Sequence, residues 1–330
     1  MHVPLPLLRR AAANYFLRRV YCVSWELTYN CNADCVHCHR GVPVPKERLA
    51  SVDRLIEICE EIRPLVSVMS GGEPLIRRDL EEIVRGFKSS GASTRVQVNT
   101  NAALLTPKRF ASLKEAGLDN FVISFDFPDE RHDEWRAIPG LFRRIEALVT
   151  SLPPEDKRLV ALTCVFNSRN FRDAPRMADV AREWGVNINF SAYTWLRTYD
   201  MDLLIQPEDM QEARAVVAQL SEMRRTYGHV LTSDGVLQGM LDFYENRGMG
   251  GCRAGERLLV VNPDGTFSPC GLRITSYSTR EELLEDFTEN NDCSACYTIS
   301  RAMTERPLWY LVKDHLHHLR QVAPPGRVEA

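Results

Sequence analysis

Cysteines are the residues of this 330-residue chain whose number and spacing most directly indicate chemistry. Seven of the ten lie in two groups. The first group is Cys31, Cys35 and Cys38, and the second is Cys252, Cys270, Cys293 and Cys296. Arginines interrupt the apolar stretches near the start of the chain, so it shows no convincing export signal. We therefore expect a cytoplasmic protein, in which clustered cysteines indicate a metal site or catalysis rather than disulfides.

The first cysteine group is typical of a metal site, and its spacing is compatible with either an iron–sulfur cluster or zinc. Three cysteines with spacing x3 and x2 follow a predicted strand in a polar loop. Four thiolates would close a [4Fe–4S] cluster, whereas three leave one iron open to another ligand. Zinc normally takes four ligands, and either His37 or His39 could supply the fourth. Spacing alone therefore allows both an iron–sulfur site and a zinc site.

A second motif, Ser70-Gly71-Gly72-Glu73-Pro74, follows the next predicted strand. Its two glycines allow a close approach of the backbone to a ligand, and the Glu73 carboxylate is suited to hold an ammonium group. With these two motifs in this order, the chain resembles the radical S-adenosylmethionine (SAM) enzymes over about residues 20–195. That family carries CxxxCxφC after its first strand, where φ is an aromatic residue, and GGEP after its second. His37 occupies the φ position.

The resemblance implies a fold, a cofactor and a reaction. The fold is a partial (β/α)6 barrel. The cluster on Cys31, Cys35 and Cys38 would bind SAM through its open iron, and Gly71, Gly72 and Glu73 would hold the methionine amine. The full set of expected SAM-binding positions is His37, Ser70, Gly71, Gly72, Glu73, Asn99, Thr100, Ser124, Asp126, Asn167 and Ser168. In this family the reduced cluster cleaves SAM to a 5′-deoxyadenosyl radical, which takes a hydrogen atom from the substrate.

The second cysteine group surrounds a predicted hairpin, 257–261 and 266–269, with a turn at Asn262-Pro263-Asp264-Gly265. Its spacing resembles the start of the SPASM/twitch extension found on many radical SAM enzymes. The shorter, twitch version implies one auxiliary [4Fe–4S] cluster on all four cysteines. Zinc, or a three-cysteine cluster with an open iron, are alternatives. Because a fully ligated cluster cannot easily bind substrate, we expect it to accept an electron, which indicates a net oxidation.

Alternating strand-like and helix-like segments would position the first two motifs. The predicted strands are 21–28, 65–69, 95–99, 121–125, 159–166 and 187–192, and the predicted helices are 52–62, 79–90, 107–116, 141–151 and 171–184. This alternation predicts a parallel α/β sheet that right-handed crossovers curl into a full or partial barrel. Active sites in such folds lie at the carboxyl ends of the strands, where both motifs fall. Cys22, Cys59 and Cys164 stand alone in apolar stretches and are expected to be buried.

The chain divides into five predicted parts. They are an amphipathic helix (1–20), the barrel (21–200), a helical linker (201–246), a small twitch-like domain of hairpin and helix (247–300), and a C-terminal helix and tail (301–330). The loop after the fourth strand holds possible bases, His132, Asp133 and Glu134. Tyr193, Trp195 and Arg197 are expected at the barrel mouth.

We expect a radical SAM oxidoreductase that acts on a small metabolite. A peptide or protein maturase stays open, as does a lipid- or isoprenoid-modifying enzyme. The lipid alternative rests on the basic N-terminal helix, which would then contact a membrane surface instead of packing on the fold. A non-enzymatic metal-binding module is disfavoured by the two motifs.

The amino-acid composition limits the classes of partner and of protein that fit this chain. With 41 Lys and Arg against 44 Asp and Glu, the net charge of −3 gives no reason to expect nucleic acid. Collagen-like, coiled-coil and disordered classes are excluded by the apolar content. No stretch approaches the ~18 apolar residues of a membrane span. Cluster reduction requires an electron donor such as a flavodoxin or ferredoxin.

Overall fold

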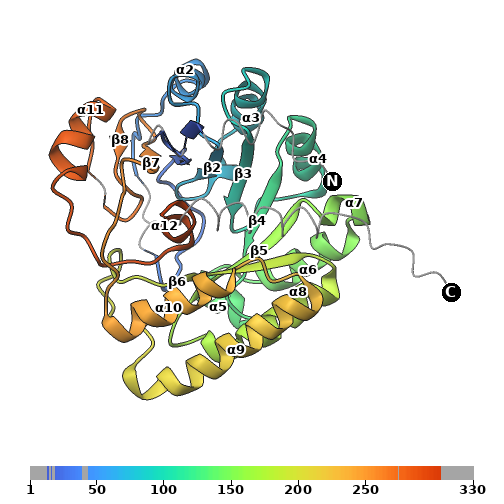
Figure 1. The fold of residues 1–330 in the computed structure, drawn as a ribbon. Coiled ribbons are helices and arrows are strands. Elements are labelled where there is room, and N and C mark those ends of the chain that lie inside the picture. The colour runs from blue at the N-terminus through green and yellow to red at the C-terminus, as the bar shows by residue number, and fades with distance from the viewer. Residues whose placement is uncertain (1–12, 15, 17–18, 39–43, 274, 306–330) are drawn as a thin grey trace.

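The computed structural model describes residues 13–14, 16, 19–38, 44–273 and 275–305 (Figure 1). Most of the predicted N-terminal helix, His39 and the chain beyond residue 305 lie outside these described residues. Across the part of the chain that is described, no helix is long and apolar enough to cross a membrane.

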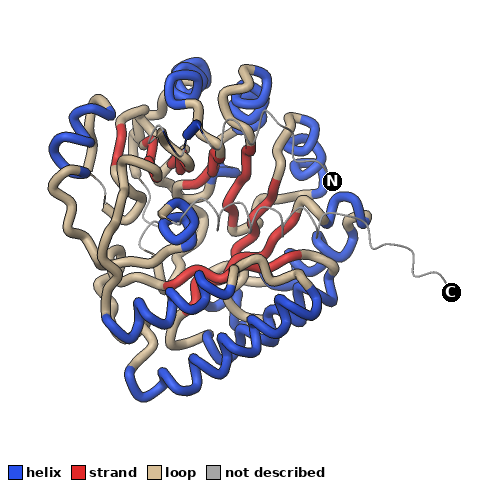
Figure 2. The backbone as a smooth tube through the Cα atoms, viewed as in Figure 1, coloured by secondary structure: helices blue, strands red, loops and turns tan. Residues whose placement is uncertain are grey.

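A single curved sheet of eight strands forms the centre of the described chain (Figure 2). Six parallel strands follow one another in order along the chain. They are β1 (Cys22–Glu26), β2 (Val66–Ser70), β3 (Arg95–Thr100), β4 (Asn120–Ser124), β5 (Val160–Phe166) and β6 (Asn187–Ala192). The α/β class and all six predicted strands are confirmed. β1, β2, β4 and β5 bury consecutive side chains on both faces of the sheet, whereas buried and half-buried side chains alternate in β3 and β6.

The hairpin of the C-terminal region joins this same sheet. Its strands are β7 (Leu258–Val261) and β8 (Phe267–Ser268), which pair antiparallel as predicted. β7 also runs parallel to β1, with Cys22 opposite Leu258 and Trp25 opposite Val261. The strand order is therefore β6-β5-β4-β3-β2-β1-β7-β8. β1, the strand that leads to the first cysteine group, is thus the barrel strand that pairs with the hairpin.

Amphipathic helices cover the outer side of the curved sheet (Figure 1). They are α2 (Val52–Ile62), α3 (Leu80–Ser89), α4 (Pro107–Glu115), α6 (Leu141–Ser151) and α8 (Ala174–Trp184). In α3 the buried side chains Leu80, Ile83, Val84 and Phe87 follow the helical period. Ser51 caps α2 through the N–H of Arg54, and Gly185, with a φ of 75°, ends α8 in the left-handed region. These local signals explain why all five predicted helices are present.

Two helices of the barrel region were not predicted, α5 (Arg131–Arg136) and α7 (Pro154–Lys157), whereas α10 (Asp234–Asn246) lies within the segment 201–246 that was predicted to be helical. The prediction of a loop at His132–Glu134 is wrong, because these residues form the centre of α5 and His132 is fully buried. Burial lowers the pKa of His132 to about 4, and its Nδ1 accepts the Asp126 N–H at 3.2 Å.

The remaining helices lie towards the C-terminus. They are α9 (Met210–Tyr227), α11 (Arg280–Leu283) and α12 (Ile299–Thr304), with short 3-10 turns η1 (Pro74–Ile76), η2 (Phe171–Asp173) and η3 (Pro207–Asp209) and a π turn η4 (Leu284–Thr288). α12 contacts both β6 and β7. It therefore lies across the open side of the partial barrel, between its last strand and the hairpin.

Candidate active site

The Gly71–Gly72 pair joins the cysteine loop to the end of β2. The N–H of Gly72 donates to Thr28 O at 2.6 Å, and the N–H of Glu73 donates to Asn30 O at 2.9 Å. A Cβ at Gly71 would lie 2.2 Å from Thr28 O, and one at Gly72 would lie 2.1 Å from Asn30 O. In this structure the glycines make a close backbone approach to the segment that leads into Cys31, and their predicted approach to a ligand stays a prediction. Glycine is required here because any side chain would push this segment away.

Glu73 ties the end of β2 to the end of β3. Its buried carboxylate accepts hydrogen bonds from Leu75 N (3.1 Å), Thr100 Oγ1 (2.7 Å) and Asn101 N (2.8 Å). Burial raises the pKa of Glu73, and these three donors oppose the rise. The side chain of Asn101 then reaches Cys31 Sγ at 4.0 Å. Glu73 therefore fixes the end of β3, including Asn101, next to the first cysteine group. Its contact with an amine stays a prediction.

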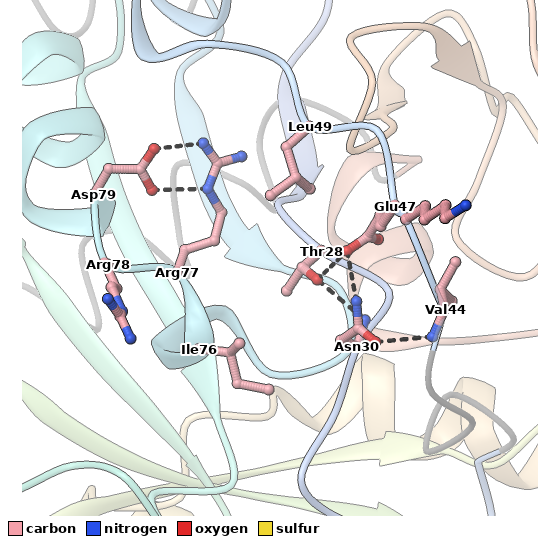
Figure 3. Close-up of a pocket in the computed structure, with 10 residues that line it drawn as sticks. Thr28, Asn30, Val44, Glu47, Leu49, Ile76, Arg77, Arg78 and Asp79 are labelled. Atoms are coloured by element: carbon pink, nitrogen blue, oxygen red, sulfur yellow. Dashed lines mark hydrogen bonds and ion pairs between the residues drawn. The ribbon is translucent and has the colours of Figure 1, made fainter.

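Glu47 holds the same segment from the other side (Figure 3). Its carboxylate accepts from Thr28 Oγ1 at 2.5 Å, from the N–H of Tyr29 and from Asn30 Nδ2 at 2.8 Å. A groove of about 600 Å³ lies beside these residues, and Arg77 and Asp79 form an ion pair on its far wall. The residues that precede Cys31 are thus held between Glu47 and the glycine pair.

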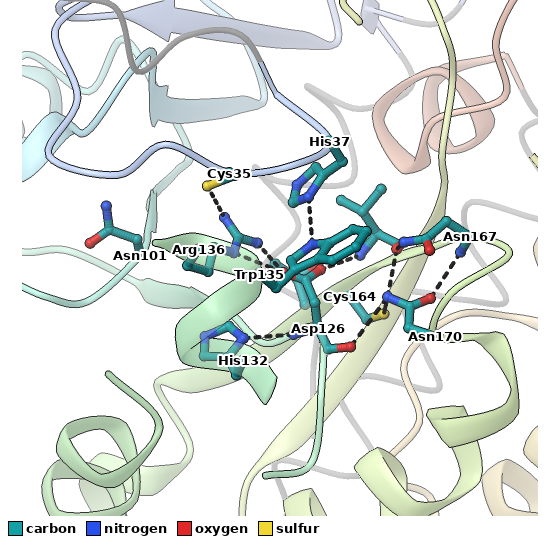
Figure 4. Close-up of polar contacts among 12 residues, drawn as sticks. Cys35, His37, Asn101, Asp126, His132, Trp135, Arg136, Cys164, Asn167 and Asn170 are labelled. Atoms are coloured by element: carbon teal, nitrogen blue, oxygen red, sulfur yellow. Dashed lines mark hydrogen bonds and ion pairs between the residues drawn. The ribbon is translucent and has the colours of Figure 1, made fainter. Parts of the chain in front are cut away.

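Helix α5 packs against the cysteine loop (Figure 4). The N–H of Val36 donates to Trp135 O at 3.2 Å, and Trp135 Nε1 donates to His37 Nδ1 at 2.7 Å. The two rings are stacked with centroids 5.6 Å apart. Burial lowers the pKa of His37 to about 4, which agrees with a neutral ring that accepts through Nδ1. His37 is therefore fixed by Trp135.

A buried ion pair connects β4 to Cys35. Arg136 donates to Asp126 Oδ2 through Nε at 2.7 Å, and its Nη1 lies 3.6 Å from Cys35 Sγ. Burial is the largest single influence on the pKa of Asp126 and would raise it. Arg136, His37, His132 and the N–H of Val165 together outweigh burial and hold that pKa below its usual range. Burial raises the pKa of Cys35 to about 11, and Arg136 opposes this rise. Asp126, predicted to bind SAM, thus also anchors a guanidinium against the first cysteine group.

Arg197 approaches the third cysteine of the first group. It lies in the turn after β6, and its Nη1 is 3.4 Å from Cys38 Sγ. Of the neighbouring residues predicted at the barrel mouth, Tyr193 is buried and donates to Asp200 O at 2.9 Å, and Trp195 is half-buried and stacks on Phe243. Of these three residues, Arg197 is the one that reaches a cysteine.

Other predicted SAM-binding residues follow the carboxyl ends of later strands. Asn99 and Ser124 are half-buried at the ends of β3 and β4. Asn167 is fully buried and donates to Val165 O at 2.7 Å, and Ser168 Oγ donates to Asp202 O at 2.6 Å. Asn167 and Ser168 thus organise the turn after β5, and SAM contacts at these positions stay predictions.

The second cysteine group is assembled from three segments. Cys252 precedes β7, Cys270 follows β8, and Cys293 and Cys296 lie before α12. Burial raises the pKa of Cys270, and the charges of Cys252 and Cys293 raise it further. The four cysteines thus come from both ends of the hairpin and from the segment before α12.

Side-chain contacts hold this second group in place. Arg301 donates to Cys296 O at 2.6 Å and to Gly250 O at 2.7 Å, and it pairs with Glu305 at 2.9 Å. Thr194, just after β6, donates to Ala295 O at 2.6 Å. The second group is thereby attached both to α12 and to the end of the barrel.

Among the described residues, no three His, Cys, Asp or Glu side chains are grouped so as to hold a metal ion. The donor set nevertheless fits iron–sulfur ligation, which uses cysteine thiolates. Guanidinium groups lie against Cys35 and Cys38, and such cations favour the thiolate form. Cys22, Cys59 and Cys164 are buried, as predicted.

Residues 25–181 match the family model of the radical SAM superfamily. The chain carries a radical SAM domain. This domain spans β1 to α8 and includes both motifs, and the family implies a [4Fe–4S] cluster and SAM.

Known proteins resemble more than the radical SAM domain. The chain is 27% identical to an AdoMet-dependent heme synthase of Methanosarcina barkeri over 81% of this chain and 82% of that protein. It is 26% identical to a probable GTP 3′,8-cyclase of Methanothermobacter thermautotrophicus over 82% and 91% of the two chains. The solved structure of anSMEcpe with bound AdoMet shares the fold at a TM-score of 0.63 and 14% identity, over 92% of this chain and 96% of that one.

Several residues of the site escaped the sequence analysis. Trp135 and Arg136 belong to a six-residue helix without an apolar period, and Glu47 and Asn101 lie in loops. Nothing in a single sequence indicates which distant backbone such side chains will contact. The first cysteine group, in contrast, was visible because its three cysteines are close in sequence, and the second was visible because its cysteines flank a hairpin pattern and end in a close pair.

Proposed function

We propose that this radical SAM protein is an oxidoreductase that removes a hydrogen atom, and then a proton and an electron, from a small-molecule substrate. The observation that carries the proposal is the cysteine loop fastened to the Gly-Gly-Glu motif at the carboxyl ends of β1 and β2. When bound and reduced, the cluster and SAM would supply the 5′-deoxyadenosyl radical. The chain's own residues would fix the cysteine loop and the polar strand ends around it.

The second cysteine group supports a net oxidation. Its four thiols would ligate an auxiliary [4Fe–4S] cluster, to which the substrate radical passes its electron. Arg197 joins this group to the first one through Gly271 and Cys38, so an electron acceptor would stand beside the site of hydrogen removal. A flavodoxin or ferredoxin is the proposed electron donor for the first cluster.

We further propose an iron porphyrin as the substrate class. The support is the similarity to a protein named as a heme synthase, which extends over most of both chains. The similarity to a protein named as a GTP cyclase makes GTP the competing substrate. Both are small molecules, which is the class expected from the sequence.

One experiment tests the proposal. Anaerobically reconstituted protein is incubated with dithionite, SAM and either iron coproporphyrin III, a carboxylate-bearing iron porphyrin, or GTP. We expect 5′-deoxyadenosine and a porphyrin product of altered mass. The matched variant, with Cys31, Cys35 and Cys38 all changed to Ala, should form neither.

The outcomes separate the parts of the proposal. Release of 5′-deoxyadenosine by the triple variant would refute the assignment of the first cysteine group. A product from GTP and none from the porphyrin would refute the substrate class but leave the radical chemistry intact.

A further inference from the structure

Arg197 contacts both cysteine-bearing regions at once. Its Nη1 lies 3.4 Å from Cys38 Sγ in the loop after β1. Its Nη2 and Nε donate to Gly271 O at 2.6 and 3.2 Å, directly after Cys270. The side chain therefore spans from the first cysteine group to the second.

A buried carboxylate orients this guanidinium. Glu26 Oε1, at the end of β1, lies 3.7 Å from Arg197 Nη2, and the Glu26 side chain is 3% exposed. A Cβ at Gly271 would lie 2.7 Å from Glu26 Oε1 and 3.3 Å from Arg197 Nη2. Glycine at position 271 thus lets the end of the hairpin lie directly against the ion pair.

The same arrangement of carboxylate, guanidinium and thiol occurs at two other cysteines. Asp126 and Arg136 lie against Cys35, and Glu305 and Arg301 lie against Cys296. Arg136 contacts a cysteine of the first group, and Arg301 contacts one of the second. Arg197 differs because its contacts reach both regions.

The chemistry of arginine suits this position. A guanidinium presents five donors in a planar fork, so it can bind a carbonyl and a thiolate at the same time, whereas a lysine ammonium is a point charge on a flexible stem. A fixed positive charge beside thiolate ligands stabilises the added electron of a reduced cluster, and this effect is stronger away from water.

We propose that Arg197 is a positioning residue that ties the cysteine loop to the end of the hairpin and supplies one positive charge to both cysteine groups. The inference rests on the proposed function, because it assumes a cluster on each group. It adds a physical link between the two clusters, through Cys38 and Gly271.

The test compares Arg197→Gln, Arg197→Lys and Arg301→Gln with the wild type. Redox titration of the reconstituted protein, followed by EPR, gives the reduction equilibrium of each cluster. Arg197→Gln should disfavour reduction of both clusters by tenfold or more, about 59 mV for one electron. Arg197→Lys keeps the charge and should restore most of this loss. Arg301→Gln should affect the second cluster alone.

Hydrogen exchange tests whether Arg197 connects the cysteine loop to the end of the hairpin, and this test does not depend on the clusters. In iron-loaded and iron-free protein, both Arg197 variants should speed exchange at least threefold in peptides that cover residues 35–38 and 270–273. Arg301→Gln should leave residues 35–38 unchanged.

The failures are distinguishable. A second cluster whose reduction is unchanged in Arg197→Gln, or exchange rates equal to wild type in both peptides, would overturn the inference. A wild-type protein that holds no reducible cluster would refute the proposed function, and the exchange measurement would still decide whether Arg197 joins the two regions.

Discussion

Asp126 and Arg136 show how single charges shape the first cysteine group. Both side chains are buried, and their contact is 2.6 Å long. A buried ion pair gives little net stability, but removing one partner leaves an uncompensated charge in the interior. The pair therefore fixes the position of α5 relative to the end of β4, and in this position the guanidinium lies against Cys35.

Replacing Asp126 with Asn should be costly. The change keeps the side-chain size but leaves the charge of Arg136 unpaired, so we expect the free energy of unfolding to fall by about 3–5 kcal/mol. Urea denaturation measures this. The control is Glu130→Gln, which removes an exposed ion pair with Arg143 and should cost about 0–1 kcal/mol. Equal losses in the two variants would show that the buried pair has no special role.

The elements divide into those with local signals and those without. α2 and α6 begin and end where their apolar period and flanking residues predicted, and the six barrel strands agree within a few residues. α5 could not be predicted, because RHDEWR has no amphipathic pattern and its position depends on contacts of Trp135 and Arg136 with the cysteine loop. The parallel pairing of β7 with β1 could not be predicted from the sequence either, because a hairpin pattern does not indicate which strand the hairpin will pair with.

The junction between the cysteine loop and β2 yields a prediction about Gly72. In Gly72→Ala the new methyl group would meet Asn30 O at 2.1 Å, which is backbone and cannot simply rotate away. We expect a loss of about 1–3 kcal/mol in unfolding free energy and weaker iron binding at the first group. Urea denaturation and iron analysis measure the two effects.

Gly250→Ala is the matched control for this junction, because a Cβ there would have no atom within 4 Å. It should change stability by less than about 0.5 kcal/mol. If Gly72→Ala behaves like Gly250→Ala, the glycine is not needed for the approach of the two segments.

In the whole molecule, the sheet order brings the two cysteine groups together. β1 lies between β2 and β7, so the loop after β1 is next to the end of the hairpin, and Arg197 after β6 reaches both. α12 contacts β6 and β7 and closes this arrangement. The sequence predicted two metal groups but not their connection, since that depends on contacts between residues 74 or more positions apart. The predicted division into a barrel, a linker and a twitch-like domain stays a prediction.

Iron and sulfide analysis tests the central claim, that this chain holds two iron–sulfur clusters on its two cysteine groups. Anaerobically reconstituted wild-type protein should hold about eight iron and eight sulfide per chain, four for each cluster. Changing Cys31, Cys35 and Cys38 to Ala should leave about four, and so should changing Cys252, Cys270, Cys293 and Cys296. A wild-type value of about four that is unaffected by the second set of changes would contradict the account.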